Sequence, residues 1–114
     1  MSDPNCIFCK IANKELNTKI IYENEDIIAF NDLKPISPTH ILVIPKKHYK
    51  NLLAVDDERL LSKLLLSIQE IAKQEGLSEK GFRTVINTGD NGGQTVYHLH
   101  VHILGKRFHT WPPG

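Results

Sequence analysis

The chain has 114 residues and a formal net charge of +1 at pH 7, and its length suits one domain with a single core. Acidic and basic residues are interspersed, which argues against the basic surface of a nucleic-acid-binding protein, so we expect no nucleic-acid partner. The N-terminus is polar and no apolar run reaches membrane-spanning length, so we expect a cytoplasmic protein with no membrane partner.

The first predicted elements are a short helical segment and a hairpin. Residues 6–12 are expected to form a helix or a turn, and they contain the only cysteines of the chain, Cys6 and Cys9. In a reducing compartment this spacing is typical of half a zinc site or of a redox pair rather than of a structural disulfide. Residues 19–23 and 27–31 predict two strands that are joined by a tight turn.

The middle of the chain predicts a buried strand and a long helix. A loop with two prolines precedes residues 40–44, whose nearly continuous apolar character indicates a central strand that is buried on both faces. Asp56 and Asp57 are suitable caps for the helix that follows, and its apolar residues repeat at intervals of three and four. This helix is expected to end near Gly76.

Two further strands are predicted after the helix, at residues 82–87 and 97–104, with a glycine-rich loop at 89–93 between them. Strands thus occur on both sides of one long helix, and several of their connections have the length of a hairpin turn. This order favours an α+β domain with a mainly antiparallel sheet of five strands. The apolar C-terminal tail, which includes Trp111, is expected to dock on its own sheet or on another subunit.

Histidines occupy alternate positions in the last predicted strand, at His98, His100 and His102. Side chains alternate between the two faces of a strand, so these three share one face and the apolar residues between them take the other. A row of three imidazoles needs a polar partner, which is a metal, a phosphate or a set of fixed hydrogen-bond partners.

The residues alone leave three interpretations of this histidine row. The row is the polar face of a strand, or it binds zinc as in several hydrolases, or one imidazole is a nucleophile towards phosphorus or carbon. No carboxylate lies in or beside the motif to complete a catalytic zinc site. The N–H groups of Gly92 and Gly93 can approach an anion closely, which favours the nucleophile. The side chains of Gln94 and Thr95 add further donors.

Three segments of the sequence resemble one family. Residues 93–104 with the His-x-His-x-His motif, residues 38–48 and the Trp-Pro-Pro-Gly ending at 111–114 are similar to the histidine triad (HIT) superfamily, in particular its HINT branch of nucleoside phosphoramidases. The resemblance runs from about Cys6 to the last residue and implies a single HIT domain over residues 1–114. It also implies a sheet of five mainly antiparallel strands with one long and one short helix, which dimerises into a continuous sheet.

The resemblance implies catalytic roles for four residues. HIT enzymes act on the α-phosphate of a nucleoside through a nucleotidyl-histidine intermediate, and the position in the motif makes His100 the nucleophile. His102 would bind the phosphate and steer the leaving group, and His40 would complete the cluster from the neighbouring strand. Thr95 stands where the HINT branch usually has serine, so a hydroxyl is kept for proton donation to a departing amine.

Other positions match substrate contacts of the family. Asp32 would accept hydrogen bonds from the ribose hydroxyls. The base pocket, with core packing as the equal alternative, would be lined by Phe30, Leu33 and Leu42. The phosphate would be contacted by Asn87, Gly93, Gln94 and His102. Trp111 belongs to the tail that, in the family, reaches the active site of the partner subunit and helps to select leaving groups.

The cysteines resemble those of HIT proteins that bind structural zinc through Cys-x-x-Cys and two histidines. The matching ligands here would be Cys6, Cys9, His48 and His98. A closed site with four ligands leaves no open position, so this Zn²⁺ would be structural and the enzyme would use no catalytic cofactor. Two free cysteines without a metal are the alternative.

The implied function is hydrolysis of the P–N bond of purine nucleoside 5′-phosphoramidates, such as AMP joined to an amine or to lysine, by a homodimer. Two leucines outside the main apolar stripe of the long helix, Leu60 and Leu66, are consistent with a second buried face for that dimer. The alternatives are hydrolysis of dinucleoside polyphosphates, a non-catalytic nucleotide-binding scaffold, and a zinc-dependent hydrolase that uses the triad as metal ligands. The expected partners are purine nucleoside monophosphate derivatives and a second copy of the chain.

Overall fold

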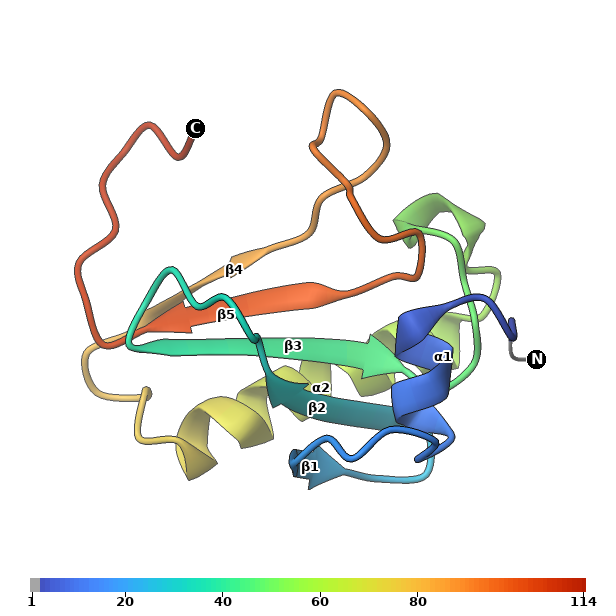
Figure 1. Cartoon of the computed structure of the whole chain (residues 1–114). Coiled ribbons are helices and arrows are strands. Elements are labelled where there is room, and N and C mark those ends of the chain that lie inside the picture. The colour runs from blue at the N-terminus through green and yellow to red at the C-terminus, as the bar shows by residue number, and fades with distance from the viewer. Residues whose placement is uncertain (1–2) are drawn as a thin grey trace.

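The protein is an antiparallel sheet with helices packed against it, described for residues 3–114 by a computed structural model (Figure 1). The sheet has five strands in the order β1-β2-β3-β5-β4, and all neighbouring strands are antiparallel. The strands are β1 (Ile20–Glu23), β2 (Ile27–Asn31), β3 (Thr39–Pro45), β4 (Phe82–Val85) and β5 (Val101–Gly105). The helices are α1 (Ile7–Ala12), α2 (Glu58–Gln74) and a short 3-10 turn, Leu52–Ala54. The predicted α+β fold, with one long and one short helix, is therefore confirmed.

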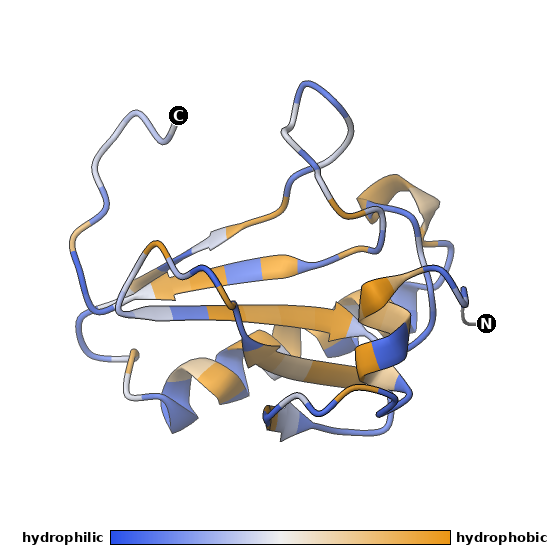
Figure 2. Cartoon of the chain, viewed as in Figure 1, coloured by the Kyte–Doolittle hydropathy of each residue, from blue (hydrophilic) through white to orange (hydrophobic). Residues whose placement is uncertain are grey.

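The strand β3 lies at the centre of the sheet and is buried along its whole length, as its apolar run predicts. Its side chains alternate between two cores. Ile41 and Val43 face α2, while Leu42 and Ile44 face α1. Figure 2 shows that hydrophobic residues follow the central strands and that the connections are mainly hydrophilic. The sheet therefore separates two apolar layers, one under each helix.

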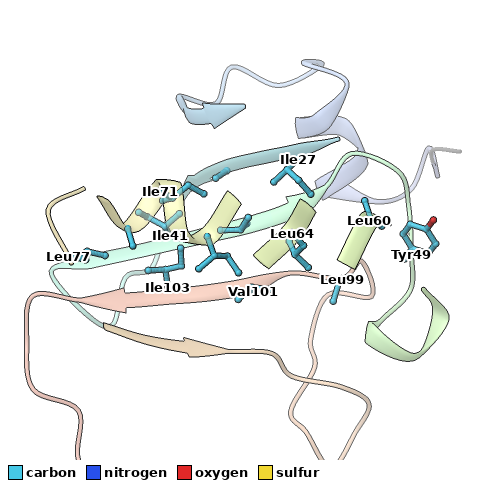
Figure 3. Packing of buried hydrophobic residues seen from close by; sticks show 14 residues of the cluster. Ile27, Ile41, Tyr49, Leu60, Leu64, Ile71, Leu77, Leu99, Val101 and Ile103 are labelled. Carbon is cyan, nitrogen blue, oxygen red and sulfur yellow. The ribbon is translucent and has the colours of Figure 1, made fainter. Parts of the chain in front are cut away.

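The long helix α2 covers one face of the sheet. Its apolar stripe, which includes Leu64 and Ile71, packs against Val101 and Ile103 of β5 (Figure 3). The helix begins after Asp57, whose side chain accepts hydrogen bonds from two backbone N–H groups of the first turn. Burial of this apolar face is the main stabilisation of such a helix, because propensity alone holds an isolated helix of this length only marginally.

Two strand boundaries differ by two residues or more from those that the sequence predicts. The strand β4 ends at Val85 rather than at 87, and β5 begins at Val101 rather than at 97. The register of β3 with β5 ends at the pair Val43 and Val101; continued by two residues it would place Leu99 opposite Pro45, and proline has no N–H group to donate to the ladder. Leu99 instead donates its N–H to the carbonyl oxygen of Tyr49, 2.7 Å away. The segment before β5, which bends at residues 96–98, is thus not part of the sheet.

The predicted division of side chains in this segment is nevertheless found. Leu99, Val101 and Ile103 belong to the core under α2. On the other side, Phe8 of α1 has its ring centroid 5.9 Å from that of His98 and 5.1 Å from that of His100. The histidine row therefore faces α1 and the open side of the sheet.

Of the two leucines expected on a second apolar face of α2, one is buried within the chain and one is exposed. Leu60 is buried in the core of its own chain, so it belongs to the main stripe, and the sequence interpretation of this residue was wrong. Leu66 is 56% exposed and its neighbour Leu65 is 60% exposed. Dimerisation remains a prediction. None of the helices among residues 3–114 combines the length and the apolarity that crossing a bilayer requires.

Candidate active site

The structure brings His40 of β3 next to the histidine row that leads into β5. The ring of His102 lies between its neighbours, with ring centroids 5.1 Å from those of His40 and of His100. The antiparallel pairing of β3 with β5 places Leu42 opposite His102 and His40 opposite Leu104. The two imidazoles of His40 and His102 therefore meet diagonally across the strand pair, on the face that α1 leaves open.

The backbone holds the imidazole of His100 in one tautomer. Its Nδ1 atom lies 2.8 Å from the carbonyl oxygen of His98, and a carbonyl oxygen only accepts hydrogen bonds. Nδ1 of His100 therefore carries the proton and donates it, which leaves the lone pair on Nε2. The side chain is buried beside Phe8, so its orientation is fixed by this ring as well as by the hydrogen bond to His98. An imidazole held in this way has the geometry that a nitrogen nucleophile requires.

A chain of hydrogen bonds also sets the tautomer of His102. The backbone N–H of Ile36 donates to Nδ1 of His40 over 3.1 Å, so His40 carries its proton on Nε2. That Nε2–H points at Nδ1 of His102, 2.9 Å away, and lies 3.4 Å from a carboxylate oxygen of Asp32. His102 thus accepts on Nδ1 and keeps its own proton on Nε2. It is a fixed donor beside His100.

Burial keeps the imidazoles of His40 and His102 neutral. Burial lowers the pKa of His102 to about 4, with the neighbouring His100 and His40 acting in the same direction and Asp32 opposing them. Burial also lowers the pKa of His40, again opposed by Asp32. Neutral rings at neutral pH agree with the hydrogen-bond pattern, which needs one protonated and one unprotonated nitrogen in each ring.

Two cavities open beside His102, and they share only Asp32 and His102. The first, of about 280 Å³, is mainly apolar, and we call it the nucleoside cavity. It is lined by Ile7, Phe8, Ile11, Thr18, Phe30, Asn31, Asp32, Leu33, Leu42, Thr95, Val96, His100 and His102. Phe30 and Leu42 also belong to the core under α1, so they both pack in the core and line the cavity. Leu33 is 96% exposed and stands at the rim.

The second cavity lies on the other side of His102, and we call it the tail cavity because residues of the C-terminal tail line part of it. Its volume is about 480 Å³. It is lined by Asp32, Lys34, Ile36, His40, Arg83, Val85, Asn87, His102, Leu104, Arg107, His109 and Pro113. Asn87, a predicted phosphate contact, is therefore next to His102, and its amide donates to the carbonyl oxygen of Gly92 over 2.6 Å.

The side chain of Gln94 holds the glycine-rich loop together. Its oxygen accepts from the N–H of Gly89 over 3.0 Å, and its amide donates to the carbonyl oxygens of Lys50 and Val96 over 2.9 and 3.1 Å. Gln94 is buried and lines neither cavity. Both N–H groups of its amide already donate to backbone carbonyl oxygens, so the structure does not place Gln94 as the predicted phosphate donor.

Two other predicted contacts also lie outside both cavities. Gly93 adopts a positive φ of 76°, a backbone conformation that favours glycine, and shapes the loop. Trp111 is 81% exposed in the tail. Within the single chain it lines neither cavity, and its place at the partner's active site stays a prediction.

The four predicted metal ligands come together under α1. The ligand atoms of Cys6, Cys9, His48 and His98 all lie within 4.8 Å of one another. Sγ of Cys6 is 3.3 Å from Nδ1 of His98, and Sγ of Cys9 is 3.2 Å from Nδ1 of His48. Neither cysteine is in a disulfide. Two sulfur and two nitrogen donors in a compact group fit a tetrahedral zinc ion.

The ring of His98 is held in the tautomer that a metal ligand needs. Its Nε2 lies 2.9 Å from the carbonyl oxygen of Pro45 and must donate to it, so the lone pair of Nδ1 points towards the cysteines. Burial lowers the pKa of His98 to about 4, which keeps this nitrogen unprotonated. Burial also raises the pKa of the Cys9 thiol in the absence of a metal. The same environment therefore disfavours a bare thiolate and favours one that a cation neutralises.

A second group of metal-type donors lies at the end of the histidine row. Oxygen or nitrogen atoms of Asp32, His40 and His102 also lie within 4.8 Å of one another. The sequence shows no carboxylate near the histidine motif, but the pairing of β2 with β3 brings Asp32 there, and its N–H donates to the carbonyl oxygen of His40. The hydrogen bond between His40 and His102 accounts for the closeness of their nitrogens without a metal.

A model of the HIT domain matches residues 13–109. The chain belongs to the HIT family. One curated HIT relative, an uncharacterised HIT-like protein from Synechococcus elongatus, is 54% identical over 95% of this chain and 96% of its own. A 14 kDa zinc-binding protein from Zea mays is 49% identical over 100% of this chain and 91% of its own. Adenylylsulfatase HINT1 from Arabidopsis thaliana is 46% identical over 99% of this chain and 79% of its own.

Solved HIT structures have the same fold. A HIT family hydrolase from Legionella pneumophila superimposes with a TM-score of 0.92, at 48% identity, over 96% of this chain and 100% of the other. A histidine triad protein from Clostridium difficile gives a TM-score of 0.91, at 46% identity, over 95% of this chain and 96% of the other. The resemblance inferred from the three sequence segments is therefore confirmed at the level of family and fold.

Proposed function

We propose that this HIT protein is a nucleotide hydrolase that cleaves the P–N bond of purine nucleoside 5′-phosphoramidates, such as AMP joined to an amine or to lysine. The observation that supports it best is the imidazole of His100. Its Nδ1 proton is held by a backbone carbonyl, and its free Nε2 belongs to a side chain that lines an apolar cavity of about 280 Å³. A pocket of this size and character suits a purine nucleoside, with the α-phosphate at the histidines.

The first step forms a covalent intermediate. The Nε2 lone pair of His100 bonds to phosphorus while the P–N bond breaks, and the bonding electron pair leaves with the amine nitrogen. That nitrogen takes up one proton, for which the hydroxyl of Thr95 and the Nε2–H of His102 are the donors in reach of the cavity. The products are a nucleotidyl-His100 and the free amine.

The second step hydrolyses that intermediate. A water oxygen bonds to phosphorus, its proton returns to the donor used in the first step, and the bond between phosphorus and Nε2 of His100 breaks. The electron pair goes back to Nε2. One water is consumed overall, and AMP and the amine are released. The Nδ1–H of His100 stays bonded to the carbonyl of His98 throughout, which stabilises the imidazolium charge of the intermediate.

Substrate binding is assigned to residues around the two cavities. Asp32 stands at their junction, where its carboxylate can accept the ribose hydroxyls. The apolar side chains of Phe30, Leu33 and Leu42 would contact the base. Asn87 is the proposed phosphate donor, whereas Gln94 is assigned to the loop.

We assign a structural zinc ion to Cys6, Cys9, His48 and His98, whose donor set and spacing fit it. When bound, the ion would supply charge neutralisation for the two thiolates and would cross-link α1 to the segments around residues 48 and 98. The relative from Zea mays that is named as a zinc-binding protein supports this assignment. We also propose a homodimer, which the exposed apolar side chains of Leu65 and Leu66 on α2 support.

A second candidate substrate is adenylyl sulfate, because the relative from Arabidopsis thaliana is named an adenylylsulfatase. The same nucleophile and the same nucleotidyl-histidine would serve, with a P–O bond broken in place of the P–N bond. Dinucleoside polyphosphates remain a third class within the superfamily.

The test follows AMP release from an AMP-amine conjugate, from adenylyl sulfate and from a dinucleoside polyphosphate. His100→Gln is expected to lower the rate by about a thousandfold or more, because the nucleophile is lost. Binding of AMP to the variant serves as the control that its cavity is intact. Release that continues at the wild-type rate in His100→Gln would overturn the nucleophile, and no release from any of the three substrates would favour a binding module. Brief addition of a chelator is expected to leave the rate unchanged, which separates this mechanism from a metal-dependent one.

A further inference from the structure

The walls of the tail cavity carry an excess of positive charge. Three of its lining residues are permanent cations at neutral pH, namely Lys34, Arg83 and Arg107. Asp32 is the only carboxylate among the lining residues, and it is already 3.4 Å from Nε2 of His40. The nucleoside cavity, by contrast, has no lysine or arginine in its lining. The two sides of the reaction centre therefore differ in charge.

These positive charges are not neutralised within the part of the chain that the structure describes. None of the salt bridges found among residues 3–114 includes Lys34, Arg83 or Arg107. Lys34 is exposed, so its ammonium is free to move towards a ligand. An anion that enters the tail cavity would thus meet charges that no salt bridge neutralises.

Neutral oxygen atoms hold both guanidinium groups in place. Arg83 donates to the carbonyl oxygens of His109 and Thr110 over 3.3 and 2.9 Å. Arg107 donates to the carbonyl oxygen of Ile36 over 3.2 Å and to other neutral oxygens. Such contacts fix an arginine without cancelling its charge. In keeping with a positive local field, burial and then the nearby Arg107 and Arg83 lower the pKa of His109.

The geometry of the reaction assigns the tail cavity to the leaving group. This step rests on the proposed function. In phosphoryl transfer the attacking and leaving atoms lie roughly in line on opposite sides of phosphorus. His100 lines the nucleoside cavity and not the tail cavity, while His102 lines both. A phosphate held at His102 therefore directs its leaving group away from His100, towards the basic walls.

We propose that this enzyme prefers leaving groups that carry an oxyanion, in particular amines that bear a carboxylate, and that Lys34, Arg83 and Arg107 form the subsite that recognises it. The charge selects for substrates in which AMP is joined to the nitrogen of an acidic molecule. Binding of the carboxylate at this subsite stabilises both the bound substrate and the amine product as it leaves.

A matched pair of substrates tests the preference. AMP is joined through its phosphorus to the nitrogen of β-alanine or of β-alaninamide, which have nearly the same size and differ by one negative charge. We expect kcat/KM to be about fivefold higher for the carboxylate, the size of a partly exposed ion pair converted to a rate ratio. The ratio is expected to approach one as the salt concentration rises, because salt screens exposed charges.

Substitution of Lys34 tests the subsite, since the side chain is exposed and its removal leaves the backbone hydrogen bond from its N–H to Asp32 in place. Lys34→Gln is expected to lower the ratio of the two kcat/KM values, and Lys34→Glu to reverse it in favour of β-alaninamide. The ratio is the readout, so a general loss of activity does not affect the conclusion. Lys73→Gln, which removes an exposed lysine of α2, is the charge-matched control and should keep the wild-type ratio.

The outcomes separate this inference from the proposed function. Equal kcat/KM values for the two substrates, or a ratio that Lys34→Glu leaves unchanged, would overturn the anionic subsite while the phosphoramidase activity stands. Failure of the wild type to release AMP from either substrate would overturn both proposals.

Discussion

The carbonyl oxygen of His98 accepts the hydrogen bond that fixes the ring of His100, over 2.8 Å, while the imidazole of His98 joins the two cysteines and His48. One residue therefore belongs to both the metal-type cluster and the histidine row. Its side chain is fully buried, so it can shift little without moving its own carbonyl. The backbone contact that orients His100 therefore comes from a residue of the cysteine cluster.

The first prediction concerns the metal. Purified protein is expected to contain about one zinc ion per chain, and Cys9→Ser to lose it together with about 3 kcal/mol or more of stability, because ligand binding in such a site is part of the folding free energy. Metal analysis and denaturant unfolding measure both quantities. A chelator should lower the stability of the wild type and have little effect on the variant. Wild-type protein that is fully folded and free of metal would contradict the assignment.

The second prediction is a loss of stability in mild acid. The pKa of His102 falls from an ordinary value of 6.5 to about 4 on folding, so the unfolded chain binds more protons between these values. The free energy of unfolding should therefore stay constant above about pH 6.5, decrease as the pH falls towards 4, and level off below that for this group. His102→Gln should show a smaller decrease between pH 7 and pH 4.5 in chemical denaturation.

The cysteine cluster also affects how the free energy of unfolding depends on pH. Because the wild type and His102→Gln share this cluster, its contribution cancels in the difference between them. A variant that loses stability on acidification as steeply as the wild type would show that His102 is not the group responsible.

The third prediction concerns the start of α2. Asp57 accepts hydrogen bonds from the N–H groups of Arg59 and Leu60, whereas the neighbouring Asp56 is not the cap. Asp57→Ala should cost about 1 kcal/mol in the free energy of unfolding, the usual value of an N-cap. Asp56→Ala removes the same charge one residue earlier and should cost clearly less. Equal losses would mean that the charge matters and the hydrogen bonds do not.

The fourth prediction distinguishes two roles of Gln94. Gln94→Ala leaves the N–H of Gly89 and two backbone carbonyls without their partner, so we expect a loss of about 1–3 kcal/mol of stability. If Gln94 held the phosphate instead, AMP affinity would fall and stability would change little. Unfolding and AMP titration of the same variant give the two quantities, and Asn87→Ala is the reference for a phosphate contact.

The sequence predicts the sheet and the long helix because each depends on a local pattern. The alternation of His98 to Ile103 and the apolar run of β3 are enough to assign their faces correctly. The extent of β5 is not local, since it depends on Pro45, which lies more than fifty residues earlier and ends the ladder from the opposite strand. Leu60 was misassigned for a related reason, because the width of the buried stripe is set by the sheet below it.

The site shows the same division. The cysteine cluster follows from residue types and from resemblance, and the structure assembles it as expected. The partners of Gln94 and the approach of Asp32 to His40 are set by loop geometry, which has no periodic signal in the sequence. The tail cavity was missed altogether, because its cations come from three separated segments. Only the pairing of β4 with β5 and the return of the tail bring Arg83 and Arg107 to one wall.

The order of the strands has a consequence for how the protein matures on the ribosome. The strand β5 is synthesised after the other four, yet it lies inside the sheet between β3 and β4. Until it emerges, the edge of β3 is unpaired and β4 has no neighbour, so the nascent chain exposes an open edge that invites wrong pairing. The segment that carries His98, His100 and His102 arrives directly before and with this strand. Closure of the sheet and assembly of the histidine row therefore take place as one event, and a chain cut short of β5 would lack both.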